Sequence, residues 1–293
     1  MDPIEYLEPK IVDSRSFKNI IYLVSKNLSS DVKPFFLKGL SKINKIVLAK
    51  AFTKYGWLLA IYHALGKIEG DMLIIYYNKE EPKWTASTLI HEVIHLALDI
   101  RRQNSLDIIV DETLAYTASF KSGFQDLYTK GVKQAIGFLS NCICPYDTYE
   151  LVNIAIPRIL AFRLTRHDYT YLVRNATKEP RTLFNTWLET NPGENEIQAL
   201  SIALKNTGIK ARLDLPEIVC REKQVIPSNV EEYSREFEGV DRDFVKMIEL
   251  LDEAAKNKQK AHEILKPWWK ELEEIKDEVE AYLYIYSHAE VDP

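Results

Sequence analysis

The sequence predicts an α+β protein with a small mixed sheet, a mostly helical remainder and a helical hairpin at the C-terminal end. Three observations carry this prediction. Short apolar runs separated by Gly56, Gly66 and Gly70 lie between residues 46 and 77, which is typical of strands joined by tight turns. Apolar residues recur every three or four positions over most of the remaining chain, which is the helical period. Residues 241–293 combine that period with dense charge, as solvent-facing helices do.

Helices account for most of the expected elements. The helical period predicts them over residues 15–28, 34–46, 84–102, 106–120, 148–165, 168–176 and 194–206. Pro34 suits the first position of the second helix, where no backbone N–H has to be paired. The sequence Asn191-Pro192-Gly193 predicts the turn that precedes the last helix of this series.

Three short apolar runs are the candidate strands. Ile46–Phe52 and Met72–Tyr77 are expected to belong to the sheet. The run Trp57–Tyr62 fits a third strand, but Trp57–Leu65 equally fits a short buried helix, because periodicity cannot separate the two over so few residues.

The chain of 293 residues is long enough for one large domain or two modest ones. The segment around Pro216 and Pro227 predicts a linker over residues 211–240. This linker would separate a domain over residues 1–210 from a C-terminal hairpin over residues 241–293. The two helices of the hairpin are expected over residues 241–256 and 259–287.

Composition excludes several classes of protein. Hydrophobic residues make up 46% and charged residues 28%, values typical of folded globular chains rather than disordered ones. No apolar run reaches the roughly 18 residues that a membrane span requires. The first residues also lack the basic and apolar regions of a signal peptide, so we expect a cytoplasmic protein. The three cysteines cannot all pair within the chain and are expected as reduced thiols.

The net charge of −5 is unevenly distributed. Residues 1–180 carry 23 Lys or Arg against 19 Asp or Glu, whereas the remainder carries 15 against 24. This mildly basic first part does not supply the strongly basic surface that phosphate binding requires, so nucleic acid is not an expected partner. The acidic C-terminal hairpin is the expected surface for a partner protein.

The segment His91-Glu92-Val93-Ile94-His95 carries the chemistry. An α-helix places residues four apart one turn above each other, so both imidazoles reach one ion. Glu92 then lies beside that ion, where its carboxylate takes a proton from water bound to the metal. The pattern is expected by chance only about 0.01 times in a chain of this composition.

Apolar residues cover the other faces of this helix, so it is expected to be buried. Three ionisable side chains in a buried helix require compensation, which a Zn²⁺ ion and its water supply. The alternative without a metal is a buried helix whose histidines are hydrogen-bonded to carbonyls or carboxylates.

This pentapeptide on a helix resembles the signature of the zincin metallopeptidases. Metzincins continue with a glycine and a third histidine, which the residues after His95 lack. The later sequence Asp111-Glu112-Thr113-Leu114-Ala115-Tyr116 instead resembles the second helix of gluzincins. The resemblance implies that Glu112 is the third zinc ligand, beside His91 and His95.

Helical spacing supports Glu112 independently. In a helix over 106–120, Glu112 shares a stripe with apolar residues and faces inward, where a carboxylate requires a cation. Three alternatives remain. Asp111 caps the helix and Glu112 is solvated, or Asp111 is the ligand, or another group such as His167 or Asp99 is the ligand.

The resemblance also has a departure. Many gluzincins carry an acidic residue four positions beyond the ligand glutamate, where it supports the first histidine, but this chain has Tyr116 there. Asp99, one turn beyond His95, is the expected substitute as a support for a ligand histidine.

Three protein ligands leave the fourth zinc position for water, which is the catalytic pattern. The resemblance implies peptide hydrolysis, with Glu92 as general base for the zinc-bound water and as proton donor to the leaving amine. His167 is the expected partner of the substrate carbonyl oxygen, ahead of Tyr116 and Tyr128. The alternative for His167 is an ordinary surface histidine in a turn.

In zincins the strand before the active-site helix forms the rim of the cleft, and residues 72–78 occupy that place. An exposed edge there would pair with an extended peptide substrate through an added strand. An ordinary core strand is equally compatible with the sequence.

The sequence therefore predicts a zincin-like zinc metallopeptidase of the gluzincin type, with its catalytic domain over residues 1–210 and a peptide or protein as substrate. One alternative is an interaction or regulatory protein that keeps the zinc without cleaving. Intact Glu92 argues against it, since a structural zinc ion needs no base. Another is a regulatory protease with a single intracellular target, similar to the metallopeptidases that inactivate phage repressors.

Overall fold

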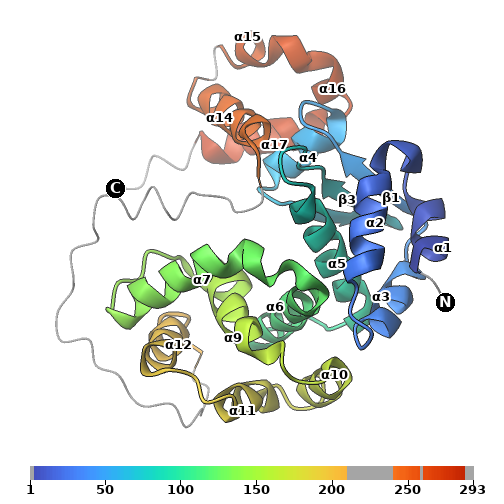
Figure 1. Ribbon diagram of the computed structural model, residues 1–293. Helices are drawn as coiled ribbons and strands as arrows, with labels where there is room; N and C mark the ends of the chain where they lie inside the picture. The colour runs from blue at the N-terminus through green and yellow to red at the C-terminus, as the bar shows by residue number, and fades with distance from the viewer. Residues whose placement is uncertain (1–2, 210–239, 258–259, 288–293) are drawn as a thin grey trace. The chain divides into compact units, whose positions relative to one another are not determined.

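The computed structural model describes residues 3–209, 240–257 and 260–287, which are mostly helical and include a three-stranded sheet (Figure 1). Packing divides the chain into two compact units. Among the described residues, the helical unit holds residues 3, 23–42 and 90–209, and the sheet unit holds residues 4–22, 43–89, 240–257 and 260–287. The expected α+β class is confirmed.

The elements of the helical unit include the ends of α2 and α5, which both begin in the sheet unit. They are α2 (Lys18–Asn27), α3 (Lys33–Leu40), α5 (Pro82–Leu98), α6 (Ser105–Ser119), η3 (Phe120–Phe124), α7 (Gln125–Ser140), α8 (Thr148–Glu150), η4 (Leu151–Ala155), α9 (Ile156–Leu164), α10 (Tyr169–Ala176), α11 (Arg181–Glu189) and α12 (Glu194–Asn206).

The sheet unit combines the three strands with short helices from both ends of the chain. Its elements are α1 (Pro3–Leu7), η1 (Glu8–Lys10), η2 (Ser14–Phe17), β1 (Lys45–Ala49), α4 (Lys54–Ile61), β2 (Gly66–Glu69), β3 (Met72–Tyr76), α14 (Arg242–Lys256), α15 (Ala261–Leu265), η5 (Lys266–Trp268), α16 (Trp269–Glu273) and α17 (Lys276–Tyr286).

Strand β3 lies in the centre of the sheet, whose strand order is β1-β3-β2. It pairs in parallel with β1, with Val47 opposite Ile74, and antiparallel with β2, with Ile68 opposite Leu73. Both edges of β3 are therefore used. Of the two alternatives for residues 72–78, the exposed edge for a peptide is wrong and the structure has the ordinary core strand, because β2, which the apolar pattern missed, covers that edge.

Of the two alternatives for the run after Gly56, the structure has the helix, α4. Thr53 begins it, since its side-chain oxygen accepts a hydrogen bond from the Gly56 N–H at 3.3 Å. A Cβ at Gly56 would lie 2.3 Å from the Lys50 carbonyl oxygen, so this entry into the helix requires glycine. The expected helix over 34–46 is too long, because α3 ends at Leu40 and the chain then enters β1.

The C-terminal helices share a core with α4 and the sheet, and Figure 1 shows α14, α16 and α17 beside α4. The predicted apolar stripe of α14 is buried, including Phe244, Met247 and Leu251. The second helix of the expected hairpin is not continuous, since Pro267 interrupts it and it divides into α15, η5, α16 and α17. The expected linker at 211–240 lies outside the described residues except for Val240.

The helical unit contains the helices expected around the His-Glu-x-x-His segment and later in the chain, whereas α7 and α11 were not anticipated. Helix α3 approaches α5 very closely. A Cβ at Gly39 would lie 2.0 Å from the Val93 carbonyl oxygen, so glycine permits this contact within the segment that carries the two histidines.

Two further expectations concern cysteines and membranes. Cys142 is disulfide-bonded, so the expectation of reduced thiols is wrong for that residue, whereas Cys144 has a free thiol. In the part of the chain that the structure describes, no helix combines the length and the apolar character needed to cross a membrane.

Candidate metal centre

Helix α5 presents His91 and His95 on one face. Their Nε2 atoms lie 2.9 Å apart, and the two rings meet edge to face with centroids separated by 4.6 Å. Ile90, Val93 and Ile94 on the other faces are fully buried. The apolar residues therefore anchor the helix, and the four-residue spacing directs both imidazoles to one point.

Helix α6 brings Glu112 to the same point. Asn104 caps this helix, accepting hydrogen bonds from the N–H groups of Leu106 and Asp107. The Oε2 atom of Glu112 lies 3.2 Å from His91 Nε2 and 3.5 Å from His95 Nε2. Glu112 is 7% exposed, so the carboxylate faces inward as the helical spacing predicts.

The three side chains fit a zinc ion geometrically. A tetrahedral zinc ion about 2.0–2.1 Å from each ligand atom requires the ligand atoms to lie about 3.3 Å from one another. The three separations between His91 Nε2, His95 Nε2 and Glu112 Oε2 are 2.9, 3.2 and 3.5 Å, which bracket that value. Two imidazoles and one carboxylate are also a ligand set that catalytic zinc sites use.

Asp111, the neighbour of Glu112, lies behind His95 rather than between the histidines. Its Oδ2 atom is 3.0 Å from His95 Nδ1, the ring nitrogen opposite the one that faces Glu112. A carboxylate in this place orients a ligand histidine. Asp99, the expected support, is exposed and forms an ion pair with Lys42 at 3.3 Å, so that expectation is wrong.

Arg102, which the motif analysis did not identify, completes the cluster from the segment between α5 and α6. Its Nε donates to Asp111 Oδ2 at 2.7 Å, and its Nη2 donates to Glu112 Oε1 at 2.8 Å. The same Nη2 lies 3.2 Å from His95 Nδ1. The sequence signal that could have predicted a cation here was the pair of adjacent acids, Asp111 and Glu112, downstream of the two histidines. Two buried carboxylates require more positive charge than one ligand site supplies.

In the metal-free protein, electrostatic attraction holds the histidines and the two acids of the cluster together. Burial lowers the pKa of His95, but the negative charges of Glu112 and Asp111 outweigh it and raise that pKa to about 10. Burial would raise the pKa of Glu112, but the charge of His95 and hydrogen bonds from both histidines hold it well below its usual value. Glu112 is therefore ionised and paired with positive groups.

Glu92 is half-buried on α5, beside His91, and the described residues give its carboxylate no hydrogen bond or ion pair. Its charge acts on Tyr149, an exposed residue of α8. Desolvation and the negative charges of Glu112 and Glu92 raise the pKa of the Tyr149 hydroxyl. Sequence reasoning did not identify Tyr149.

An aromatic wall borders His91. The ring of Tyr116 lies 4.4 Å from the His91 ring, and Tyr128 lies 5.7 Å from Tyr116. The guanidinium of Arg158 lies over both tyrosine rings, about 5 Å from each centroid. The Nδ1 atom of His91 is buried without a hydrogen-bond partner, and the ring of Tyr116 packs against the same imidazole.

His167, the residue expected to contact the substrate carbonyl, is not brought to the cluster by any contact that the structure describes. It lies in the turn between α9 and α10, half-buried, and its carbonyl accepts a hydrogen bond from Lys121 at 2.8 Å. No hydrogen bond, ion pair or ring contact among the described residues joins its side chain to His91, His95 or Glu112.

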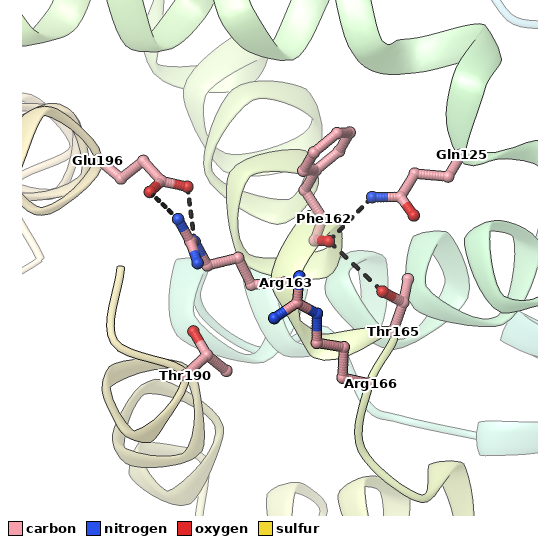
Figure 2. Close-up of a pocket in the computed structure, with 7 residues that line it drawn as sticks. All are labelled: Gln125, Phe162, Arg163, Thr165, Arg166, Thr190 and Glu196. Carbon is pink, nitrogen blue, oxygen red and sulfur yellow. Dashed lines mark hydrogen bonds and ion pairs between the residues drawn. The ribbon is translucent and has the colours of Figure 1, made fainter. Parts of the chain in front are cut away.

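A separate cavity of about 220 Å³ lies elsewhere in the helical unit (Figure 2). Its lining residues are Gln125, Phe162, Arg163, Thr165, Arg166, Thr190 and Glu196. Arg163 and Glu196 are paired across it at 2.7 Å, and Gln125 and Thr165 both donate to the Phe162 carbonyl. None of the residues of the metal centre lines this cavity.

Comparison with known proteins gives no relative: no family model, no curated protein and no solved structure matches this chain.

Proposed function

We propose that this protein is a zinc-dependent metallopeptidase of the gluzincin type. One observation carries the proposal: His91 Nε2, His95 Nε2 and Glu112 Oε2 converge at the separations a zinc ion requires. Glu92 follows His91 on the same helix, in the place that the general base has in this motif. Asp111 behind His95 adds the carboxylate–histidine arrangement of catalytic zinc sites.

The roles of the side chains follow from their positions. A bound zinc ion supplies Lewis acidity, which polarises the scissile carbonyl and makes water a better acid. Glu92 takes the proton of the attacking water and returns it to the leaving amine, a role for which its unpaired, half-buried carboxylate is suited. His91, His95 and Glu112 hold the ion, and Asp111 fixes the orientation of His95.

The group that stabilises the oxyanion has two main candidates, since Tyr116 and Tyr128, the other two residues that the sequence offered, are buried. His167 is the sequence-based candidate, although the described contacts leave it unconnected to the cluster. Tyr149 is the second, because the charges of Glu112 and Glu92 act on its hydroxyl and its ring is exposed to a substrate.

Substitution of the base tests the proposal. The Glu92→Gln variant should bind about one zinc ion per chain, as the wild type does, and should lose cleavage of unfolded protein or peptide substrates by at least about 100-fold. Glu189→Gln, at an exposed position on α11, is the matched control and should cleave normally. Equal cleavage by Glu92→Gln and wild type would contradict the proposed role of Glu92.

A non-cleaving zinc protein is the second candidate, and the burial of the cluster favours it. His91 and Glu112 are only 8% and 7% exposed, a degree of enclosure that also suits a structural ion. This function predicts zinc in the purified wild type without cleavage of any member of a broad peptide library.

A further inference from the structure

The guanidinium of Arg102 contacts both acids of the described cluster, and the proposed chemistry gives it no role. We propose that Arg102 is the positioning residue of this metal centre: it restricts Glu112 to one-oxygen ligation and braces His95 through Asp111. This inference rests on the proposed zinc site and deepens it.

The contacts of Glu112 divide between its two oxygens. Oε1 accepts a hydrogen bond from Arg102 at 2.8 Å, whereas Oε2 faces the Nε2 atoms of His91 and His95 at 3.2 and 3.5 Å. An oxygen that already accepts from a guanidinium is a poor second ligand for a cation. Arg102 therefore leaves one oxygen of Glu112 to the ion, which keeps the protein ligands at three and favours a four-coordinate ion such as zinc.

The contacts of Asp111 extend the same restraint to His95. Its Oδ2 atom lies 2.7 Å from Arg102 Nε and 3.0 Å from His95 Nδ1. When a metal is bound, this carboxylate favours the His95 tautomer with a proton on Nδ1, and the lone pair of Nε2 is then directed to the ion. Arg102 holds the carboxylate in the place where it performs this task.

The geometry requires arginine rather than any cation. Nε and Nη2 lie on one edge of the planar guanidinium, and here that edge spans two different carboxylates. A lysine ammonium is a compact charge on a flexible stem and does not fix two acids at once. Arg102 also balances charge, because zinc alone offsets two of the three carboxylates of Glu92, Asp111 and Glu112.

The neighbouring residue provides a matched control. Arg101 has the same side chain in the same segment, is exposed, and makes no side-chain contact with the cluster among the described residues. A substitution at Arg101 removes the same charge from the same segment without removing the hydrogen bonds that Arg102 donates to Asp111 and Glu112.

Zinc affinity measured by chelator competition on the full chain tests the inference. Arg102→Gln and Arg102→Lys should both weaken zinc binding by about 10–100-fold, whereas Arg101→Gln should stay within about twofold of wild type. With Co²⁺ as a spectroscopic probe, both Arg102 variants should lose the intense visible absorption of four-coordinate cobalt, because Glu112 then ligates through both oxygens. Circular dichroism verifies that each variant is folded.

The outcomes separate the inference from the zinc site itself. Zinc binding by wild type with unchanged affinity in both Arg102 variants overturns the inference and leaves the zinc site intact. Wild-type affinity in Arg102→Lys alone shows that charge, not positioning, matters, and tighter binding in Arg102→Gln shows that Arg102 competes with the metal; each overturns the inference. Absence of zinc binding by the wild type overturns the zinc site and the inference together.

Discussion

Helices α14 and α6 both have a buried face, but the chemistry of that face differs between them. The inner face of α14 is apolar, with Phe244, Met247 and Leu251 packed in the core of the sheet unit. The inner face of α6 carries Asp111 and Glu112 among its buried residues in the helical unit. Apolar burial stabilises a fold unaided, at about 1.5–3 kcal/mol per large side chain.

Burial of an ionised group instead destabilises a fold, unless an opposite charge or hydrogen bonds compensate it. Around α6 the compensation comes from His91, His95 and Arg102, which surround both carboxylates. A fold that needed only stability would fill this space with apolar residues, as the core around α14 does. The comparison therefore assigns structure to α14 and supports the chemistry proposed for α6.

Removal of the ligand carboxylate should have the largest effect on the site. Glu112→Ala should abolish zinc binding, because two imidazoles alone do not hold the ion, whereas Asp111→Ala should retain zinc with about 10–100-fold lower affinity. Metal analysis after dialysis and chelator competition measure both. Loss of zinc in Asp111→Ala with retention in Glu112→Ala would reverse the ligand assignment.

Truncation in the apolar core should cost stability without affecting the metal. Phe244→Ala removes a buried ring that packs edge to face on Tyr76 at 4.5 Å, and it should lower the free energy of unfolding by about 3–5 kcal/mol. Zinc affinity of the folded variant should be unchanged. Denaturant unfolding measures the first quantity, and Val245→Ala, at a position 40% exposed on the same helix, should change it by less than about 0.5 kcal/mol.

Two variants identify the group that stabilises the oxyanion. We expect a loss of about 100-fold in kcat in one of His167→Gln and Tyr149→Phe, with zinc content unchanged in both. Steady-state kinetics on a peptide substrate decides between them, and Tyr171→Phe, another exposed tyrosine, is the control. Normal kcat in both variants would exclude both residues from this role.

The smallest expected effect is the pH dependence of the stability of the metal-free protein. Because its pairing raises the pKa of His95 to about 10, the stability from this pair is complete below the unfolded value near 6.5. That stability is lost as the pH rises toward 10. Glu112, whose pKa is lowered, contributes above about 4.5 and loses its contribution as the pH falls further.

The temperature of thermal unfolding of the metal-free protein should therefore fall between pH 7 and pH 10. Saturating zinc should reduce this dependence, since the ion replaces the proton on His95. A metal-free unfolding temperature that rises over this interval would contradict the ion-paired cluster.

The spacing of apolar residues along the chain predicted secondary structure best for helices that bury a face of side chains three and four residues apart. The helix with His91 and His95, the inward direction of Glu112 and the apolar stripe of α14 all follow from the helical period, which depends on neighbours three and four residues away. Short runs were less certain for the same reason. Strand β2, none of whose residues is buried, has no apolar pattern to detect.

The sequence by itself determined which residue types meet on the two helices and that Glu112 faces inward. Tertiary structure alone decided that Asp111 rather than Asp99 supports His95, that Arg102 joins the two acids, and that β3 lies in the centre of the sheet. The physical reason is range. Periodicity orients a side chain relative to its own helix axis, whereas these contacts depend on how separate segments pack against one another.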